Sequence, residues 1–270
     1  MNLILGAATG YNKKDLYYFI KSLRKFYSDE IYLIFNLDLN KETNKFLDEN
    51  NIKKIFTNEN PKKIFKTRYK IYYSFLKDNT KYHNILITDT RDVIFQKNPF
   101  LEKKLSRINF FMEDKVIKDC FFNSNWIKRL YGKEKYEKIK NYQISCSGTT
   151  IGSHKAILEY LFIMNDHIDK YSYYSLFKSP GTDQGNHNYI INTIRFADSK
   201  KFSNKDGIVA TLSDADMTNF ELTKKFLNKN NEQFSIIHQY DRFFNEKKKT
   251  FNKELSKYFE NLRNNLIKEK

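Results

Sequence analysis

The first ninety residues alternate short apolar segments with amphipathic segments, and this alternation constrains the fold more than any other feature of the chain. Four short segments have the length of strands: 2–8, 30–36, 52–57 and 84–89. The first of them is a continuous apolar run, which is typical of a strand buried on both faces. The segments between them carry apolar side chains at helical spacing: 13–27, 41–50 and 61–78. Strands that alternate with helices form a parallel sheet with helices on both faces. The sequence therefore predicts an α/β fold with a mostly parallel sheet.

Local signals mark several helix starts. Asn12 precedes the first helical segment, Asn60 and Pro61 begin the third, and Ser153 precedes an apolar helical segment at 154–168. Side chains of Asn and Ser cap helix N-termini, and proline is favoured in the first turn. These residues support the predicted helices.

The second half of the chain is less regular. Its sequence pattern predicts strands at 107–113 and 142–153 and a helix with a capping pattern at 182–194. It also predicts a short strand followed by a loop within 234–243. No internal repeat and no linker rich in Pro, Gly or Ser divides the chain. We therefore expect one domain over 1–245, followed by a basic amphipathic C-terminal helix over 246–270.

The charge balance favours anionic partners. The chain has 48 Lys and Arg residues against 32 Asp and Glu, a formal net charge of +16. Such an excess suits nucleotides, diphosphates, nucleic acid or an acidic membrane surface, and it also arises from a solvated lysine-rich surface. A nucleic-acid-binding protein is disfavoured because no zinc finger, RNP-type strand or basic helix with interleaved aromatics precedes the tail.

Cysteine usage and hydropathy predict a cytoplasmic protein. Cys120 and Cys146 are too few for a disulfide framework and are typical of reduced buried thiols. The segment "MNLILGAATG" lacks the basic region of a signal peptide, and no apolar run has the length of a membrane span. We expect a soluble protein or one bound peripherally to a membrane.

The segment "ILITDTRDVIFQKNPF" (85–100) ends a predicted buried strand in Asp89, followed by Arg91 and Asp92. In an open parallel sheet, ligands bind outside the carboxyl ends of the strands. Two carboxylates in this position can converge on one divalent cation, and Arg91 can hold a carboxylate or a phosphate. Arg68, on the preceding helix, is a weaker candidate for a phosphate contact. The alternatives are a surface turn for the aspartates and a solvated helix face for Arg68.

Three further segments have the residue types of a ligand site: "SCSGTTIGS", "GTDQGNHNYI" and "IIHQYDRF". The first supplies small residues that permit close backbone approach. In the second, Asp183 and His187 share a helical face, with Gln184 beside them. In the third, His238 follows an apolar strand and Arg242 comes four residues later. Each has a structural alternative, namely a glycine-rich turn, a helix cap or a half-buried histidine, but together they predict one site.

These segments, with "GAATGY" near the N-terminus and "TDTRDVIFQKNPF" in the middle, resemble a known enzyme family over about residues 3 to 243. The chain looks like a nucleotide-sugar-dependent glycosyltransferase of the GT-A (Rossmann-like) fold. It is similar in particular to bacterial, viral and plant GT-A-like proteins with a DxRDVxFQxxPF segment. The resemblance implies transfer of a sugar from a nucleoside diphosphate sugar to a hydroxyl of a glycan or lipid-linked acceptor.

The resemblance also implies roles for individual residues. The N-terminal loop would hold the base and ribose, through Ala7, Ala8, Thr9 and Tyr11. The aspartate motif would hold Mn²⁺ or Mg²⁺ against the diphosphate, and His238 would be a further metal ligand.

The metal motif departs from the family pattern. The usual motif is Asp-x-Asp, whereas the aspartates here are spaced Asp-x-x-Asp. Aligned on the following residues, Asp92 takes the main chelating position and Thr90 falls where the first aspartate is expected. Asp89, one residue earlier, could bind the metal, its water or the ribose, so the first position of the motif stays open.

The catalytic prediction centres on Asp183, with Gln184 beside it. An inverting enzyme needs a carboxylate base on the acceptor hydroxyl, and a retaining enzyme needs a group near the anomeric carbon; Asp183 suits either role. Arg242 could stabilise the leaving diphosphate. Haloacid-dehalogenase-like phosphatases, which also end a strand in aspartates, require Asp-x-Asp-x-Thr/Val. Nucleotidylyltransferases normally start with a glycine- and basic-rich loop, which "GAATGY" does not provide.

The C-terminal segment places five apolar residues on one stripe of a basic helix: Phe251, Leu255, Phe259, Leu262 and Leu266. Such a helix can lie in an anionic membrane interface, which would suit a lipid-linked acceptor. The commoner fate of an apolar stripe on a terminal helix is to pack back on the sheet.

Overall fold

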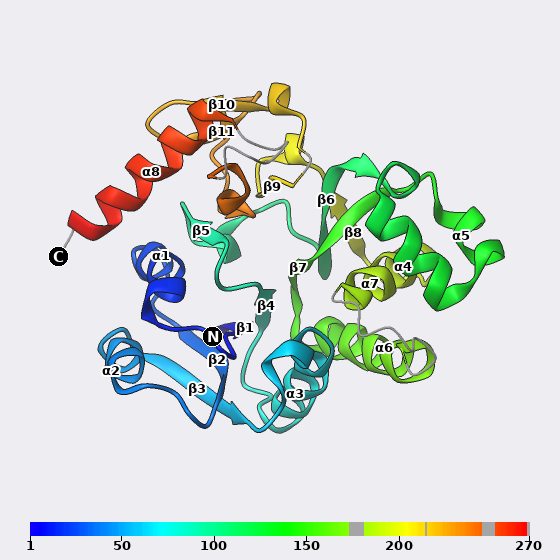
Figure 1. Ribbon diagram of the computed structural model, residues 1–270, viewed down its shortest axis with the longest axis horizontal. Helices are drawn as coiled ribbons and strands as arrows, with labels where there is room; N and C mark the ends of the chain where they lie inside the picture. The colour runs from blue at the N-terminus through cyan, green and yellow to red at the C-terminus, as the bar shows by residue number, and fades with distance from the viewer. Residues whose placement is uncertain (173–180, 214, 245–251, 269–270) are drawn as a thin grey trace.

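The computed structural model describes residues 1–172, 181–213, 215–244 and 252–268. Within them a seven-stranded sheet runs in the order β3-β2-β1-β4-β7-β6-β8 (Figure 1). Its strands are β1 (Asn2–Ala7), β2 (Glu30–Asn36), β3 (Ile52–Thr57), β4 (Asn84–Thr88), β6 (Ile108–Val116), β7 (Gln143–Ser153) and β8 (Ser199–Phe202). All neighbouring pairs are parallel except those that β7 forms with β4 and β6. The predicted α/β class with a mostly parallel sheet is confirmed.

Helices cover both faces of this sheet. The helices of the described residues are α1 (Lys13–Arg24), α2 (Lys41–Glu49), α3 (Ile64–Asp78), α4 (Phe121–Tyr131), α5 (Lys133–Ile139), α6 (His154–Ser172), α7 (Thr182–Thr193) and α8 (Lys253–Lys268). On one face, Phe19 of α1 and Phe46 of α2 share a core cluster with Ile4 of β1. On the other face, Tyr69 of α3 and Tyr160 of α6 are buried against the remaining strand side chains. β1 and β4 are buried on both faces, which explains their continuous apolar sequences, whereas the edge strand β3 is partly exposed and includes Lys53 and Lys54.

Most of the predicted helix starts are confirmed. The Asn12 side chain accepts a hydrogen bond from the Lys14 backbone N–H, and Asp15 completes a capping box. Asn60 caps a 3₁₀ turn, Pro61–Lys63, that leads into α3. The start of α7 differs from the prediction, because its N-cap residue is Gly181 and no side chain in the described part of the chain caps it.

The order of strands creates a crevice at one end of the sheet. The chain runs outward from β1 through β2 to β3 and then returns to add β4 on the other side of β1. Parallel sheets bind ligands at such a switch point, outside the carboxyl ends of the strands. Ala7 ends β1 and Asp89 follows β4 directly, so both lie at this crevice.

A second, three-stranded sheet was not predicted. It pairs β5 (Val93–Phe95), β12 (Ile236–His238) and β9 (Val209–Thr211), with β12 in the middle. The register places His238 opposite Val93, the residue that follows Asp92. A short hairpin of β10 (Phe220–Leu222) and β11 (Phe226–Asn228) lies in the same part of the chain. Of these strands the sequence predicted only β12, as the short strand within 234–243; the others are three residues long and leave no periodic signal.

The C-terminal helix α8 lies beside α1 (Figure 1). Its apolar residues Leu255, Phe259 and Leu266 are buried, and the Tyr17 hydroxyl donates a hydrogen bond to the Leu266 carbonyl at 3.4 Å. The stripe therefore packs on α1 and a separate apolar cluster rather than on the central sheet. Phe251 and the preceding lysines lie outside the described residues. No helix in the described part of the chain is both long enough and apolar enough to cross a membrane.

Candidate functional site

A cavity of about 590 Å³ opens at the crevice between β1 and β4. This volume is in the range of small-molecule sites. Its wall includes most of the residues that the sequence singled out: Ala7, Tyr11, Arg68, Asp89, Arg91, Asp92, Asp183, Gln184 and Arg242. The structure therefore brings together segments from the two halves of the chain at one place.

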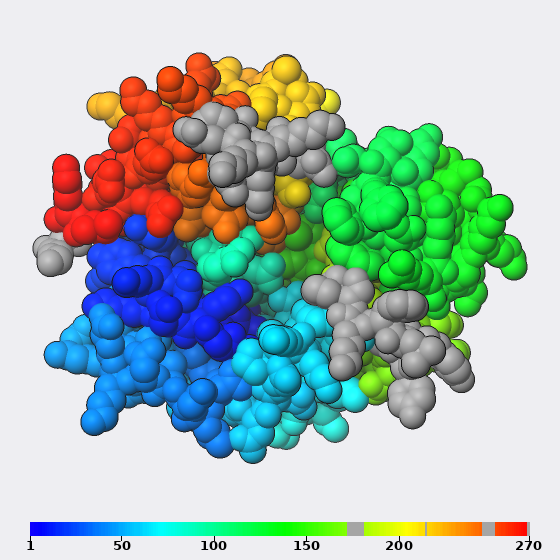
Figure 2. Space-filling view, in the orientation of Figure 1, coloured from blue at the N-terminus to red at the C-terminus, as the bar shows by residue number. Residues whose placement is uncertain are grey.

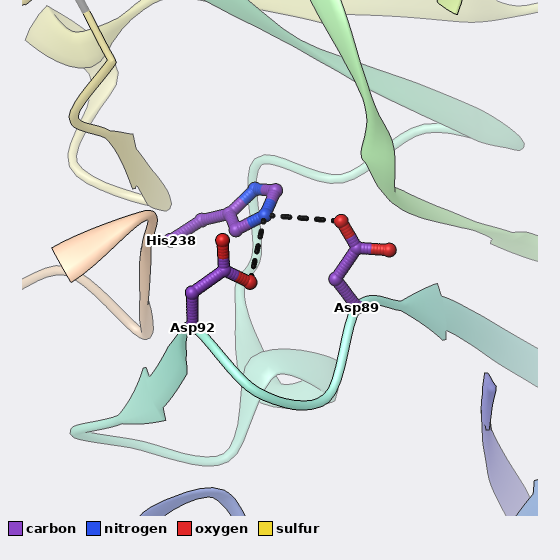
Figure 3. Close-up of side chains that lie close together, drawn as sticks. All are labelled: Asp89, Asp92 and His238. Atoms are coloured by element: carbon purple, nitrogen blue, oxygen red, sulfur yellow. Dashed lines mark ion pairs between the residues drawn. The ribbon is translucent and has the colours of Figure 1, made fainter. Parts of the chain in front are cut away.

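Asp89 and Asp92 line this cavity and form a compact cluster with His238, which is fully buried and is not among the described residues of the cavity wall (Figure 3). The His238 Nε2 atom lies 3.4 Å from Asp89 Oδ2 and 3.7 Å from Asp92 Oδ1. One ligand atom from each residue lies within 4.8 Å of the others. The Nε2 atom is buried and makes no hydrogen bond to any described residue. A buried ring nitrogen that faces two carboxylates is the arrangement expected of a divalent-cation site.

The orientation of His238 is set by the strand behind it. Its Nδ1 atom lies 3.5 Å from both Cys146 Sγ and Thr149 Oγ1 on β7. Burial acts to lower the pKa of His238, but Cys146 and the two carboxylates outweigh it and raise that pKa. The ring is therefore protonated in the absence of a cation, and binding of a metal at Nε2 would displace that proton. The next residue, Gln239, has φ of 63°, and its N–H donates to the Asp92 carbonyl at 2.7 Å. This left-handed backbone conformation lets the turn after β12 bond to the loop that carries Asp89 and Asp92.

Gly148 explains why the β7 segment contains small residues. A Cβ atom at this position would lie 2.4 Å from Asp89 Oδ2 and 2.5 Å from the His238 ring. The Gly148 carbonyl also accepts the Asp89 backbone N–H at 2.8 Å. The predicted close approach is therefore present, and it brings the backbone against the Asp89 and His238 side chains.

The two aspartates differ in electrostatic environment. Burial raises the pKa of Asp92, although His238 opposes this. Burial also acts to raise the pKa of Asp89, but the Arg68 guanidinium and His238 outweigh it and hold that pKa well below its usual range. Asp89 is therefore a carboxylate throughout the ordinary pH range.

Arg68 is buried, contrary to the prediction of a solvated helix face. It is 7% exposed, and its two terminal nitrogens contact two carboxylates. Its Nη1 atom lies 2.6 Å from Asp89 Oδ1, and its Nη2 atom lies 3.0 Å from Asp183 Oδ2. The guanidinium thus joins the end of β4 to the start of α7, and desolvation of Arg68 is offset by this double pairing.

Asp183 is buried at the second position of α7. Burial raises the pKa of its carboxyl group, and Arg68 opposes this rise. The alternative of a helix cap is wrong, because Gly181 is the N-cap residue. Asp183 therefore presents a carboxylate to the cavity from a fixed position.

Gln184 and His187 hold α7 in place. The Gln184 amide accepts the Ser147 N–H at 2.8 Å and donates to the Ser145 carbonyl at 2.7 Å. The fully buried His187 ring contacts the Tyr160 hydroxyl at 2.8 Å and the Ser145 hydroxyl at 2.9 Å. These contacts fasten α7 to β7, so the geometry gives Gln184 a positioning role beside Asp183.

Two half-exposed guanidinium groups also line the cavity. Arg91 Nη2 lies 3.2 Å from Asp241 Oδ2. Arg91 therefore pairs with Asp241 and not with Asp89 or Asp92, its neighbours in the sequence. Arg242 Nη2 lies 3.7 Å from Asp92 Oδ2, and its Nε lies 3.9 Å from Asp241 Oδ1. Asp241 thus holds both arginines next to the metal cluster, where they can contact an anionic ligand.

The N-terminal loop contributes Ala7 and Tyr11 to the cavity wall, whereas Ala8 and Thr9 are buried and are not among the described residues that line it. The Thr90 hydroxyl donates to the Ala7 carbonyl at 2.8 Å. Thr90 therefore holds the loop between Asp89 and Asp92 against β1. The residue that lies in the cluster with Asp92 and His238 is Asp89, not Thr90.

Several residues of the site were missed by the sequence analysis. Asp241 lies within a segment that was singled out, but its pairing with two arginines depends on tertiary structure. Glu113 lines the cavity from β6, and its place at the end of a predicted strand is the same signal that identified Asp89. Asn123 and Trp126 of α4 also line the cavity, and no local pattern marks them.

No protein-family model matches this chain, and a search of curated proteins finds no match. The assignment of a function therefore depends on the geometry of the cavity.

Proposed function

We propose that the protein is a divalent-metal-dependent glycosyltransferase that transfers a sugar from a nucleoside diphosphate sugar to an acceptor hydroxyl. The observation that carries the proposal is the Asp89, Asp92 and His238 cluster at the switch point of a parallel sheet. The adjoining cavity has room for a nucleotide and basic groups for its phosphates.

The residues present fit Mn²⁺ or Mg²⁺. Two carboxylates and one imidazole provide hard and borderline ligands and leave positions for water or phosphate oxygens. The His238 Nε2 atom is buried without a hydrogen bond to any described residue, and a cation would satisfy it. The close approach of the Gly148 backbone to Asp89 and His238 supports a set of side chains held in one arrangement.

The donor would occupy the part of the cavity nearest β1. Ala7 and Tyr11 line the wall where the base and ribose would lie. Arg91 and Arg242 are about half exposed and are positioned by Asp241, so they can contact the diphosphate without leaving a buried charge unpaired. A bound cation would neutralise the charge that develops on the leaving nucleoside diphosphate.

Asp183 is the group proposed to act at the sugar. In an inverting reaction, the bond from the anomeric carbon to the phosphate oxygen breaks as the acceptor oxygen bonds to that carbon. The Asp183 carboxylate then takes the proton of the acceptor hydroxyl. In a retaining reaction, the same carboxylate would face the anomeric carbon. Arg68 holds Asp183 in position through Nη2, and burial raises its pKa, which makes it a stronger base.

Calorimetry on an Asp92→Asn variant tests the metal site. We expect the wild-type protein to bind UDP or GDP in the presence of Mn²⁺, and we expect this binding to be lost in the variant while the far-ultraviolet circular dichroism is unchanged. Asp166→Asn is the control, because Asp166 is exposed on α6 and is not among the cavity-lining residues of the described chain. Unchanged nucleotide binding by Asp92→Asn would contradict the assignment.

A panel of nucleotide sugars then tests the reaction class. We expect slow Mn²⁺-dependent hydrolysis of one donor in the absence of acceptor. Release of pyrophosphate from a nucleoside triphosphate would instead indicate a nucleotidylyltransferase, and hydrolysis of phosphomonoesters would indicate a phosphatase.

A further inference from the structure

The cavity extends past the metal cluster to a wall that the proposed donor site does not use. Five side chains form this wall, which we call the α4 wall: Glu113, Cys120, Phe122, Asn123 and Trp126. They come from β6, from α4 and from the residue just before α4. In the space-filling view, α4 and α5 form a green lobe at the right of the molecule (Figure 2).

Two aromatic rings stand on the α4 wall. Phe122 is 62% exposed, and its ring centroid lies 5.9 Å from that of Trp126, with the planes inclined by 32°. The Trp126 indole packs directly on Gly181, where an added Cβ would lie 2.3 Å from the ring. The indole is therefore held beside the start of α7, two residues before Asp183. A paired, partly exposed aromatic surface inside a cavity is typical of a ligand site.

The same wall carries one buried hydrogen-bond acceptor without a partner among the described residues, the side-chain oxygen of Asn123. Asn123 is 6% exposed, and its Nδ2 atom donates to Cys120 Sγ at 3.3 Å. Its Oδ1 atom is buried and has no hydrogen-bond partner among the described residues. A buried amide oxygen without a donor is energetically unfavourable, so a ligand that donates a hydrogen bond to it gains affinity. Glu113, which is also buried, adds a carboxylate to the same wall.

Together these groups select for one ligand chemistry. Amide and carboxylate oxygens require hydroxyl or amine donors, and the aromatic faces carry negative charge that favours polarised C–H groups. A sugar ring presents both, with C–H bonds on its face and hydroxyl groups at its edge. An alkyl chain would cover the aromatic rings but leave the Asn123 oxygen unpaired.

We propose that the α4 wall binds the ring of a carbohydrate acceptor. The ring stacks on Trp126 and Phe122, and its hydroxyls donate to Asn123 and Glu113. This assignment rests on the proposed function, because it places the acceptor next to Asp183. It names the acceptor class, a glycan, for the reaction proposed above.

The chain contains a single tryptophan, so intrinsic fluorescence reports on the α4 wall directly. The full-length protein is titrated with methyl glucosides, galactosides and mannosides, and with hexanol and N-acetyltyrosinamide as aliphatic and aromatic comparators. We expect a saturable change in Trp126 emission with at least one glycoside. Phe122→Ala and Asn123→Leu should each weaken that binding by roughly tenfold, the loss expected for one hydrogen bond or ring contact.

Phe162→Ala is the matched control, because Phe162 is 60% exposed on α6 and is not among the described residues of the cavity wall. It should leave glycoside affinity unchanged. Since Phe122 is exposed, Phe122→Ala tests the wall even if Asn123→Leu unfolds the protein. Glycoside affinity that survives Phe122→Ala, or a response to the comparators but to no glycoside, overturns the proposal.

Calorimetry with UDP and Mn²⁺ on the same samples separates the two proposals. Glycoside binding without nucleotide binding would support the assignment of the α4 wall and contradict the proposed donor site. Nucleotide binding without any glycoside response would support the donor site and contradict the assignment of the α4 wall. If Phe122→Ala weakens UDP binding, the wall belongs to the nucleotide, and the acceptor assignment is overturned.

Discussion

His238 shows at the scale of one residue how the site depends on neighbours that are not ligands themselves. Its Nδ1 atom faces Cys146 and Thr149, and its Nε2 atom faces the two aspartates. The backbone of Gly148 passes so close to the ring that a side chain has no room there. A small residue is therefore required on β7 for the ligands to meet, which is a packing requirement and not a direct contact with substrate.

Asp183→Asn tests the proposed base. The amide occupies the same volume but cannot accept a proton, so we expect turnover to fall by roughly 10²-fold or more while nucleotide affinity is retained. Steady-state kinetics and calorimetry on the same preparation measure the two quantities. Asp169→Asn is the control, because Asp169 is an exposed aspartate that pairs with Lys70 at 2.8 Å on the surface. Wild-type turnover in Asp183→Asn would remove this residue from the mechanism.

At the scale of elements, the second sheet positions the cluster of Asp89, Asp92 and His238. β5 begins at Val93, directly after Asp92, and β12 pairs with it so that His238 lies opposite Val93. A shift of this register by one residue would turn His238 to the other face of the sheet. The histidine and the aspartate loop are thus joined by backbone hydrogen bonds between strands of only three residues.

Helix α8 is expected to stabilise the fold through its buried stripe. The Phe259 ring is fully buried, with centroids 5.7 Å from those of Phe226 and Tyr240. Phe259→Ala should lower the free energy of unfolding by about 3 to 5 kcal/mol, since it leaves a cavity in that cluster. Ile267→Ala, on the exposed side of α8, should change it by less than about 0.5 kcal/mol. Equal urea midpoints for the two variants would show that α8 does not pack as described.

At the scale of the whole molecule, the chain keeps its excess positive charge mostly on the surface, and the buried charges are paired. Arg68 is the clearest case, with one carboxylate on each side of its guanidinium. Glu30 is a partly buried charge that is also paired, because Lys53, Lys81 and Tyr82 all contact its carboxylate and join β2 to β3 and to the segment before β4.

The Glu30 network predicts a loss of stability in acid. Burial acts to raise the pKa of Glu30, but hydrogen bonds from Lys53, Tyr82 and Lys81 outweigh it and lower the pKa to about 2. The unfolded value is about 4.3, so the stabilisation is fully present above that pH and is lost as the pH falls towards the folded pKa.

Glu30→Gln removes this linkage. The difference in unfolding free energy between wild type and Glu30→Gln should be largest above pH 5 and should shrink towards pH 2, as measured by urea unfolding across that range. Glu134→Gln, which breaks an exposed pair with Lys138 within α5, serves as the control and should show little pH-dependent difference. A difference for Glu30→Gln that does not vary with pH would refute the linkage.

The sequence by itself determined the features that depend on residues close together in the chain. Alternating apolar and amphipathic segments specified strands and helices of the parallel half, and Asn12 specified where α1 begins, because periodicity and capping are local. The position of Asp89 and Asp92 at the end of a buried strand also followed, since parallel strands place their carboxyl ends at one edge of the sheet.

Only the tertiary structure decided which of these residues meet. Arg68 pairs with a carboxylate 115 positions away, and this pairing, which no periodic pattern records, is what buries it. His238 reaches the aspartates through a three-residue strand, and Trp126 and Asn123 reach the cavity because α4 packs on α7. Burial and charge pairing depend on contacts between distant segments, whose free energy is set by the whole packed core rather than by the local sequence.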